Sequence, residues 1–351
     1  MPGPRLNWAF MPDVEELGIR ERLEEKEEEL SQFASKSRLT KGRERYEKPC
    51  PVRTDFQRDR DRIIHSKAFR RLKHKTQVFI APVGDHYVTR LTHTLEVSQL
   101  ARTIARALNL NEDLTEAISL GHDLGHTPFG HIGEEVLNNL YHDGFRHSEQ
   151  SLRVVDKLEK GGQGLNLTWE VRDGILNHSK SRWDIFEPGY GEAATLEGEI
   201  CQIADAIAYI NHDIADAIRA GLIGEDELPQ DAVSTLGHSH SERINSMVCD
   251  IIENSWPTGG ERPSIKMSSN VQAKTNLLRE FLFERVYLPL QDSKESRIAK
   301  KTLRILYDHF AKHPEALPQE YLTHEDPERG AADYIAGMTD QFALTLAASL
   351  G

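Results

Sequence analysis

Apolar residues recur every three or four positions along most of the 351-residue chain. This spacing is typical of amphipathic helices, because it gathers apolar side chains on the one stripe that faces a core. The clearest example covers residues 196–220, where isoleucines occupy one face and polar residues the other. Further helices are predicted over residues 55–76, 92–108, 113–123, 152–158, 171–177, 242–253, 271–287, 296–312 and 331–350.

Signals for strands are few in this sequence. Residues 78–89 fit a short strand or hairpin, because their polar and apolar residues alternate around turn-forming residues. Thr127 followed by Pro128 predicts the cap and first turn of another helix, which continues through Leu140. The pattern as a whole predicts an all-α fold.

Three regions differ in composition and in the strength of the helical pattern. Residues 1–52 are rich in charged residues and predict a charged helix and an extended arm, packed on the surface or on a partner subunit. Residues 53–225 carry the strongest periodicity and are expected to form the core. Residues 226–351 have softer signals and are expected to form a helical region packed on that core.

The charge balance narrows the range of partners. The formal net charge is −13, from 43 basic and 56 acidic residues, and an acidic surface disfavours general binding to nucleic acid. Residues 58–75 are an exception, since basic side chains outnumber acidic ones there. Such a cluster suits a small anionic ligand, although for most of its members a solvated helix face is the alternative interpretation.

The cellular compartment is predicted from the absence of three signals. No apolar stretch approaches the length that crosses a bilayer, so no membrane partner is expected. The first residues lack the layout of a signal peptide. Cys50, Cys201 and Cys249 are scattered and form no CxxC pair, as is usual for reduced thiols. A cytoplasmic protein is therefore predicted.

Candidate chemistry concentrates in GHDLGHTPFGHIGEE, residues 121–135. His122 and Asp123 are adjacent at the end of an apolar helix, and imidazole with carboxylate suits divalent Mn, Fe, Co, Zn or Mg. His93, on the buried stripe of the preceding helix, could supply a third ligand, and a carboxylate of a later helix a fourth. Hydrogen-bonded histidines of an ordinary core are the alternative.

The order His93, His122-Asp123 and Asp205 resembles the H…HD…D signature of the HD-domain superfamily of metal-dependent phosphohydrolases. The wider sequence resembles the deoxyguanosinetriphosphate triphosphohydrolase-like family within it, over residues 59–79, 89–102, 121–135 and 333–344. The resemblance implies an HD-domain helical bundle extended by a C-terminal helical region. It also implies that these four residues bind the divalent metal ion.

The activity implied by the resemblance is hydrolysis of deoxynucleoside triphosphates, dGTP among them, to a deoxynucleoside and inorganic triphosphate. Water would attack the α-phosphorus, and a metal ion suits this reaction because it acidifies water and neutralises developing charge. Two alternatives remain open at this point. One is an HD-type nucleotidase or phosphodiesterase acting on monophosphates or cyclic nucleotides, and the other is a regulatory nucleotide-binding or single-strand-binding protein.

Catalytic roles are also implied by the resemblance. His131 and Glu134 would form a pair beside the metal ion, in which Glu134 orients or charges His131 for proton transfer. A first-turn acid that only favours the helix dipole is the alternative for Glu134. His126 and His147 resemble family histidines that lie near the phosphates or donate a proton.

Substrate contacts follow in the same way. Tyr209 would lie under the deoxyribose, while Asp213 and Gln77 would bind its 3′-hydroxyl. Arg90 would contact the phosphates, with Lys180 and Arg182 as candidates for the triphosphate tail. For Tyr209 and Asp213, a solvent-exposed helix face is the alternative interpretation. Family members commonly form oligomers, so a homo-oligomer is expected, with a regulatory nucleotide or single-stranded nucleic acid as a further partner.

Overall fold

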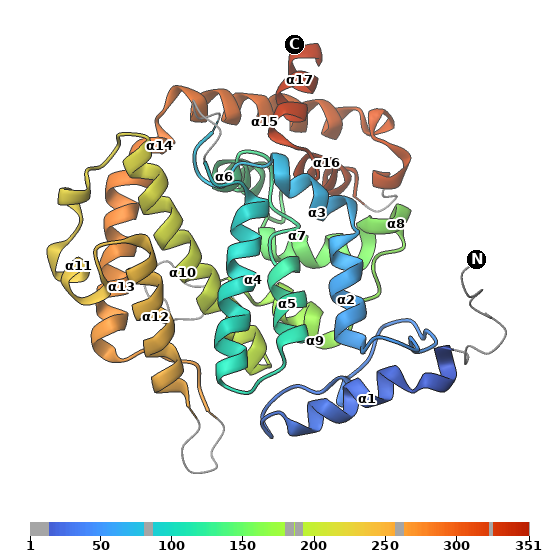
Figure 1. The fold of residues 1–351 in the computed structure, drawn as a ribbon. Helices are drawn as coiled ribbons and strands as arrows, with labels where there is room; N and C mark the ends of the chain where they lie inside the picture. Colours follow the sequence, from blue (N-terminus) through green and yellow to red (C-terminus); the bar gives the residue numbers. More distant parts are fainter. Residues whose placement is uncertain are drawn as a thin grey trace, which may run out of the picture.

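The computed structural model describes residues 14–80, 87–179, 186, 192–256, 263–322 and 326–350. Regular structure in these ranges is helical (Figure 1), with two isolated antiparallel bridges in place of strands, Arg43 with Thr168 and Thr76 with Thr89. The prediction of an all-α fold is confirmed. The second bridge joins residues near the two ends of the predicted hairpin, whose residues 81–86 lie outside the described part of the chain.

Three helices form the centre of the molecule: α4 (Arg90–Ala107), α5 (Glu112–Gly121) and α10 (Leu196–Arg219) (Figure 1). α2 (Asp55–Ile64) and α9 (Trp169–Leu176) pack around α5. The apolar stripes meet in one core, to which Ile104, Ile118 and Ile207 contribute fully buried side chains. Each such side chain contributes about 1.5–3 kcal/mol on burial, so this core determines how the three helices are arranged.

The remaining helices pack in two groups. One group joins the first core beside α10: α11 (Gln230–Leu236), α12 (His240–Ser255), α13 (Ser269–Leu282) and the π-helical turn η8 (Phe283–Tyr287). The other forms a second core with α6 (Gly130–Leu140): α15 (Lys294–Lys312), α16 (Pro327–Ala336) and α17 (Asp340–Leu350). Residues 226–351 therefore contribute to both cores. Shorter helices complete the chain: α1 (Ile19–Lys26), α3 (Lys67–Arg71), α7 (His147–Arg153), η6 (Val154–Leu158), α8 (Glu159–Gly162) and α14 (Leu288–Gln291).

Several helices end where the apolar pattern alone did not predict it. The helix expected over residues 55–76 is divided into α2 and α3, because the Ser66 hydroxyl accepts a hydrogen bond from Phe69 N and starts a new helix. The helix expected over residues 331–350 is likewise two helices, with a break after Ala336. The expectation that Thr127 caps α6 was wrong, since the left-handed residue Phe129 precedes that helix.

The charged N-terminal arm packs on the chain's own core. Glu27 accepts hydrogen bonds from Ser37, and Glu170 of α9 accepts one from the Lys41 amide. Arg43 contacts Asp59 of α2, whose side chain is fully buried and also accepts hydrogen bonds from Thr168 N and Oγ1, both at 2.7 Å. This buried ion pair ties the arm, α2 and the start of α9 together.

Removing Asp59 should therefore destabilise the fold strongly. In Asp59→Ala the buried guanidinium of Arg43 is left without its principal counter-charge, which costs roughly 3–5 kcal/mol for a buried pair. Asp55, the second partner of Arg43, is about one-third exposed, so Asp55→Ala should cost only about 1 kcal/mol. Urea unfolding followed by circular dichroism measures both variants. Equal losses in the two variants would contradict the structural role given to Asp59.

Candidate metal centre and active site

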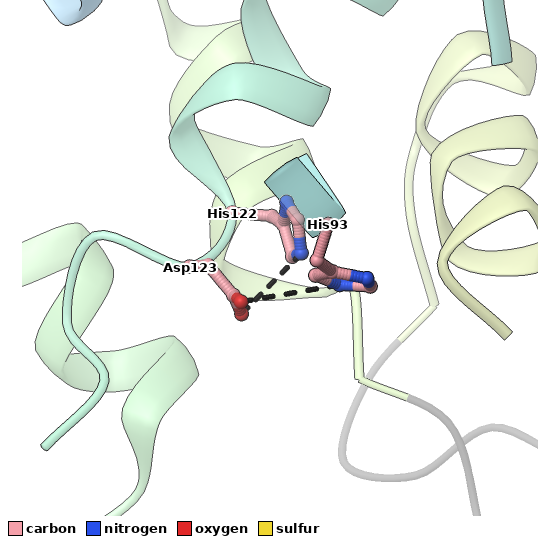
Figure 2. Close-up of side chains that lie close together, drawn as sticks. All are labelled: His93, His122 and Asp123. Atoms are coloured by element: carbon pink, nitrogen blue, oxygen red, sulfur yellow. Dashed lines mark ion pairs between the residues drawn. The ribbon is translucent and has the colours of Figure 1, made fainter. Parts of the chain in front are cut away.

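Four candidate ligands from three helices meet in the middle of the first core. His93 lies on α4, His122 and Asp123 follow α5, and Asp205 lies on α10. Figure 2 shows the first three with their polar atoms turned toward one another. His93 Nε2 is 3.1 Å from Asp205 Oδ1, and His122 Nε2 is 3.3 Å from Asp123 Oδ1. The structure therefore brings together all four residues of the signature.

The chemistry of these donors fits a divalent cation. His122 Nδ1 lies 2.6 Å from the Ser119 carbonyl and must carry its proton there, so Nε2 faces inward with a free lone pair. This Nε2 is buried and has no hydrogen-bond partner among the described residues. Burial opposes ionisation of Asp205, but the hydrogen bond from His93 and the neighbouring His122 lower its pKa to about 2. Imidazole lone pairs beside carboxylate oxygens could hold such an ion.

His212 supports His93 from behind, and the sequence analysis did not identify it. His93 Nδ1 is 2.9 Å from His212 Nε2, and His212 Nδ1 is 2.7 Å from Asp213 Oδ1. Both His212 and Asp213 are buried. For His93 Nε2 to bind a cation, its proton must be on Nδ1, where the only acceptor among these atoms is His212 Nε2. The position of His212, seven residues after Asp205 on the same face of α10, was the sequence signal that could have identified it.

The four catalytic candidates cluster beside the metal ligands, but Glu134 lies closer to a different histidine from the one expected. His147 Nδ1 is 2.9 Å from Glu134 Oε1, and the His147 amide donates to the same oxygen at 2.8 Å. His131 Nδ1 is 3.6 Å from Glu134 Oε2, and the His131 side chain is 72% exposed. His126 stacks on His147 with ring centroids 3.9 Å apart. Glu134 thus lies between two histidines, one half-buried and one open to solvent.

His178 is a further residue that the sequence analysis did not identify. Its Nδ1 is 2.7 Å from the Ile175 carbonyl, so Nε2 carries the lone pair, and this atom lies 3.0 Å from His147 Nε2. Burial, together with the nearby His122 and His147, lowers the pKa of His178 to about 3. Burial also lowers the pKa of His147, but Glu134 outweighs it and the net shift is upward. His147 therefore sits between two acceptors and is well placed to hold a proton.

Asp123, His126 and His147 also lie within reach of one another and form a second candidate group for a metal ion. The imidazole rings of the two histidines are stacked, with an angle of only 15° between their planes. A cation binds an imidazole in the plane of its ring, along the nitrogen lone pair. One ion cannot lie in two parallel planes separated by the thickness of a ring, so this geometry favours proton handling over a second metal site.

Arg90 is bound to one of the candidate metal ligands and is also a candidate phosphate-binding residue. Its Nη1 donates to Asp123 Oδ2 at 2.8 Å, and the side chain is 1% exposed. Its Nε and Nη2, and the side-chain oxygen of Gln77, have no hydrogen-bond partner among the described residues. Buried polar groups without partners are costly; a bound phosphate oxygen would satisfy the Arg90 donors, and a hydroxyl group would satisfy the Gln77 oxygen.

The polar face of α10 is covered by the C-terminal region. Arg279 of α13 donates from Nε to the Tyr209 hydroxyl at 2.6 Å, and the Tyr287 hydroxyl of η8 donates to Asp213 Oδ2. Asp213 is therefore buried, in contrast to a wet helix face. Arg279 and Tyr287 carry no sequence signal of their own, because only the tertiary fold brings them to α10. Lys180 and Arg182 lie outside the described residues.

The fold and this cluster define the class of protein. Residues 90–210 match the HD domain, and residues 265–349 match the phosphohydrolase-associated domain. HD domains are metal-dependent hydrolases, and the His/Asp cluster described above could bind the metal ion. None of the described helices is long and apolar enough to cross a membrane.

Whole-chain relatives identify the family. Proteins from Caldanaerobacter subterraneus, Desulfatibacillum aliphaticivorans and Clostridium perfringens strain SM101 are 57%, 52% and 51% identical to this chain. The matches cover 93%, 93% and 92% of this chain and 94%, 96% and 95% of the relatives. Each relative is named deoxyguanosinetriphosphate triphosphohydrolase-like protein. The chain belongs to this family of HD phosphohydrolases, as the resemblance predicted.

Loss of the His212 acceptor should weaken metal binding without removing a ligand. We expect His212→Leu to bind Mn²⁺ about 10- to 100-fold more weakly, which is typical when a group that orients a metal-binding histidine is lost. His212→Gln is the matched control, because its amide oxygen can accept from His93 Nδ1 and should preserve most of the affinity. Titration calorimetry with the metal alone measures this, with Asp123→Ala as the reference for lost binding. Wild-type affinity in His212→Leu would refute the orienting role.

Proposed function

We propose that the protein hydrolyses deoxynucleoside triphosphates, dGTP among them, to a deoxynucleoside and inorganic triphosphate. The observation that carries this proposal is the environment of Asp123. Its Oδ1 lies 3.3 Å from His122 Nε2, while its Oδ2 lies 3.9 Å from His93 Nε2 and accepts from Arg90, whose remaining donors have no partner among the described residues. A cation site and a phosphate-binding group therefore share one buried carboxylate. A metal-dependent reaction at phosphorus requires this combination.

The residues around Asp123 suit attack of water on the α-phosphorus. A divalent cation held by His93, His122, Asp123 and Asp205 would supply an acidified water and neutralise charge on the phosphoryl oxygens. Arg90 would bind the phosphates and orient them for the reaction.

Proton transfer is proposed for the histidine cluster beside the metal ligands. His147, held by Glu134 and backed by His178, would store a proton close to the phosphates, next to the stacked His126. His131, whose side chain is exposed and lies 3.6 Å from Glu134, would deliver a proton to the departing 5′ oxygen.

The sugar would bind along the polar face of α10. Tyr209 is held by Arg279, which limits its movement and makes it a firm wall against a 2′-hydroxyl. Asp213 accepts from Tyr287 and contacts His212, and its carboxylate oxygens have further lone pairs for a 3′-hydroxyl. Gln77 offers a second acceptor, a buried side-chain oxygen that has no partner in the described part of the chain.

The identity of the phosphate product tests the reaction directly. Incubation of the Mn²⁺-loaded protein with each of the four deoxynucleoside triphosphates should yield deoxynucleoside and inorganic triphosphate, separated by ion-exchange chromatography. The reason is that attack at the α-phosphorus leaves all three phosphates joined. Asp123→Ala should give no turnover, which excludes a contaminating phosphatase. A product mixture of deoxynucleoside monophosphate and pyrophosphate would overturn the proposal.

Two variants should separate the steric and the hydrogen-bonding parts of sugar selection. Tyr209→Ala opens space for a 2′-hydroxyl and should lower the preference for dGTP over GTP at least several-fold, whereas Tyr209→Phe keeps the ring, loses only the contact with Arg279, and should retain most of the preference. Asp213→Ala removes an acceptor worth roughly 0.5–1.5 kcal/mol, so it should narrow the preference for dGTP over its 2′,3′-dideoxy analogue about two- to tenfold. Competition assays measure each ratio. Equal effects of Tyr209→Ala and Tyr209→Phe would contradict the steric argument.

A further inference from the structure

Lys75 is buried in the protein interior, and the proposed reaction does not use it. Its side chain is 2% exposed, and it forms no ion pair with a carboxylate of the residues that the structure describes. Its ammonium nitrogen donates instead to the backbone carbonyls of His126 and Ala336, the latter at 2.8 Å. Burial, reinforced by Arg71 and Arg90, lowers the pKa of Lys75 to about 7. A lysine in this position is costly to bury, so an apolar residue of similar length would serve a purely structural role better.

The two carbonyls belong to distant parts of the chain. His126 lies in the loop between α5 and α6, a few residues after the candidate metal ligands. Ala336 is the last residue of α16, which belongs to the second core. The backbone carbonyl of Lys75 also accepts from the Arg90 amide at 3.2 Å, at the start of α4. Lys75 therefore contacts three parts of the chain: the start of α4, which carries Arg90, the loop between α5 and α6, and the end of the C-terminal helix α16.

Asp340 makes a parallel connection a short distance away. It is the first residue of α17, and its Oδ2 accepts from the Thr76 amide at 2.9 Å while its Oδ1 accepts from the Phe129 amide at 3.0 Å. Thr76 directly precedes Gln77, and Phe129 lies two residues before His131. A single carboxylate from the C-terminal region therefore holds two segments that carry proposed active-site residues.

The backbone between these contacts is held in an unusual conformation. Phe129 has φ 64°, which is uncommon for a residue with a large side chain. Gly130 follows with φ 60°, and a Cβ atom there would lie 2.8 Å from the Gln77 carbonyl. The strained turn therefore packs closely against the segment that contains Gln77, and the hydrogen bonds of Lys75 and Asp340 hold it there.

We propose that Lys75 and Asp340 form a clamp through which α16 and α17 position the catalytic loop, residues 123–131, against the Gln77 segment. The two are positioning residues, since neither reaches the metal ligands or the proposed substrate with its own reactive group. The inference rests on the proposed function only for the catalytic roles of His126 and His131. The physical connection between the C-terminal helices and the loop stands apart from any substrate.

The clamp predicts an unusual separation of stability from activity. Lys75→Met removes a costly buried amine and keeps the length of the side chain, but it also leaves the His126 and Ala336 carbonyls without this donor, so the midpoint of urea unfolding should change little. The loop loses a contact, however, and kcat for the best deoxynucleoside triphosphate should fall about 10- to 100-fold, as expected for a misplacement near 1 Å. KM and the Kd for Mn²⁺ should change less than about threefold, because Arg90 and the four candidate ligands are retained.

The experiment compares Lys75→Met and Asp340→Ala with matched neighbours. Lys73→Met and Gln341→Ala are the controls, since both side chains are exposed and lie close to the clamp in sequence. Hydrogen exchange of peptides that cover residues 122–131 should accelerate at least tenfold in the two clamp variants and in neither control. This measurement uses the full-length protein without substrate, and it is read beside kcat, KM and Mn²⁺ affinity.

The outcomes separate this inference from the proposed function. Faster loop exchange with reduced kcat in the clamp variants, and unchanged controls, supports the clamp. Unchanged loop exchange in both clamp variants overturns it, and so does faster exchange with wild-type kcat. A wild-type protein that is inactive on every deoxynucleoside triphosphate overturns the proposed function, while the exchange result still decides whether the two residues hold the loop.

Discussion

The carboxylate of Asp123 is buried, and the surrounding structure compensates for its charge. Burial opposes its ionisation, yet His122, His126 and Arg90 together hold its pKa well below the ordinary value. A buried charge is tolerated only when it is paired and hydrogen-bonded, so these partners cannot be moved independently. Arg90 and His122 come from different helices, and the relative position of α4 and α5 is thereby tied to a single carboxylate. The proposed cation and phosphate sites both depend on this arrangement.

Close packing of the loop after α5 keeps Asp123 in place. Gly125 lies so near α7 that a Cβ atom there would be 2.1 Å from the Ser151 amide nitrogen. The Ser151 hydroxyl donates to the His122 carbonyl at 2.6 Å and accepts from the Gly125 amide at 2.9 Å. Only glycine permits this approach. The metal ligands are therefore supported by backbone contacts, in the same way that the clamp supports the opposite end of the loop.

The sequence predicted the parts of the site that local spacing determines. The apolar periodicity located α4, α5 and α10, and the resemblance selected the four candidate ligands and the family. His212 was not predicted, because a buried histidine on an apolar helix has the same sequence pattern whether it supports a ligand or only fills a core. His178 was not predicted because it lies after the end of α9, where helical periodicity carries no information. The close contact of Glu134 with His147, thirteen residues away, depends on the path of a loop, and periodicity carries no information about such a path. Arg279 and Tyr287 likewise reach α10 only through tertiary packing.

The electrostatics of the site explain how an acidic protein could bind a highly anionic substrate. The chain has a formal net charge of −13, which repels a triphosphate at long range. Screening at physiological salt reduces that repulsion beyond about 8 Å, whereas charges inside the low-dielectric interior act strongly at short range. Arg90 lies in that interior with donors that no described residue pairs, and the cation proposed to bind beside it would add positive charge. The sign of the local field, rather than that of the whole surface, thus determines whether a nucleotide can bind. The proposed reaction would therefore require the metal ion, since without it the clustered carboxylates Asp123 and Asp205 would oppose the phosphates that Arg90 is proposed to bind.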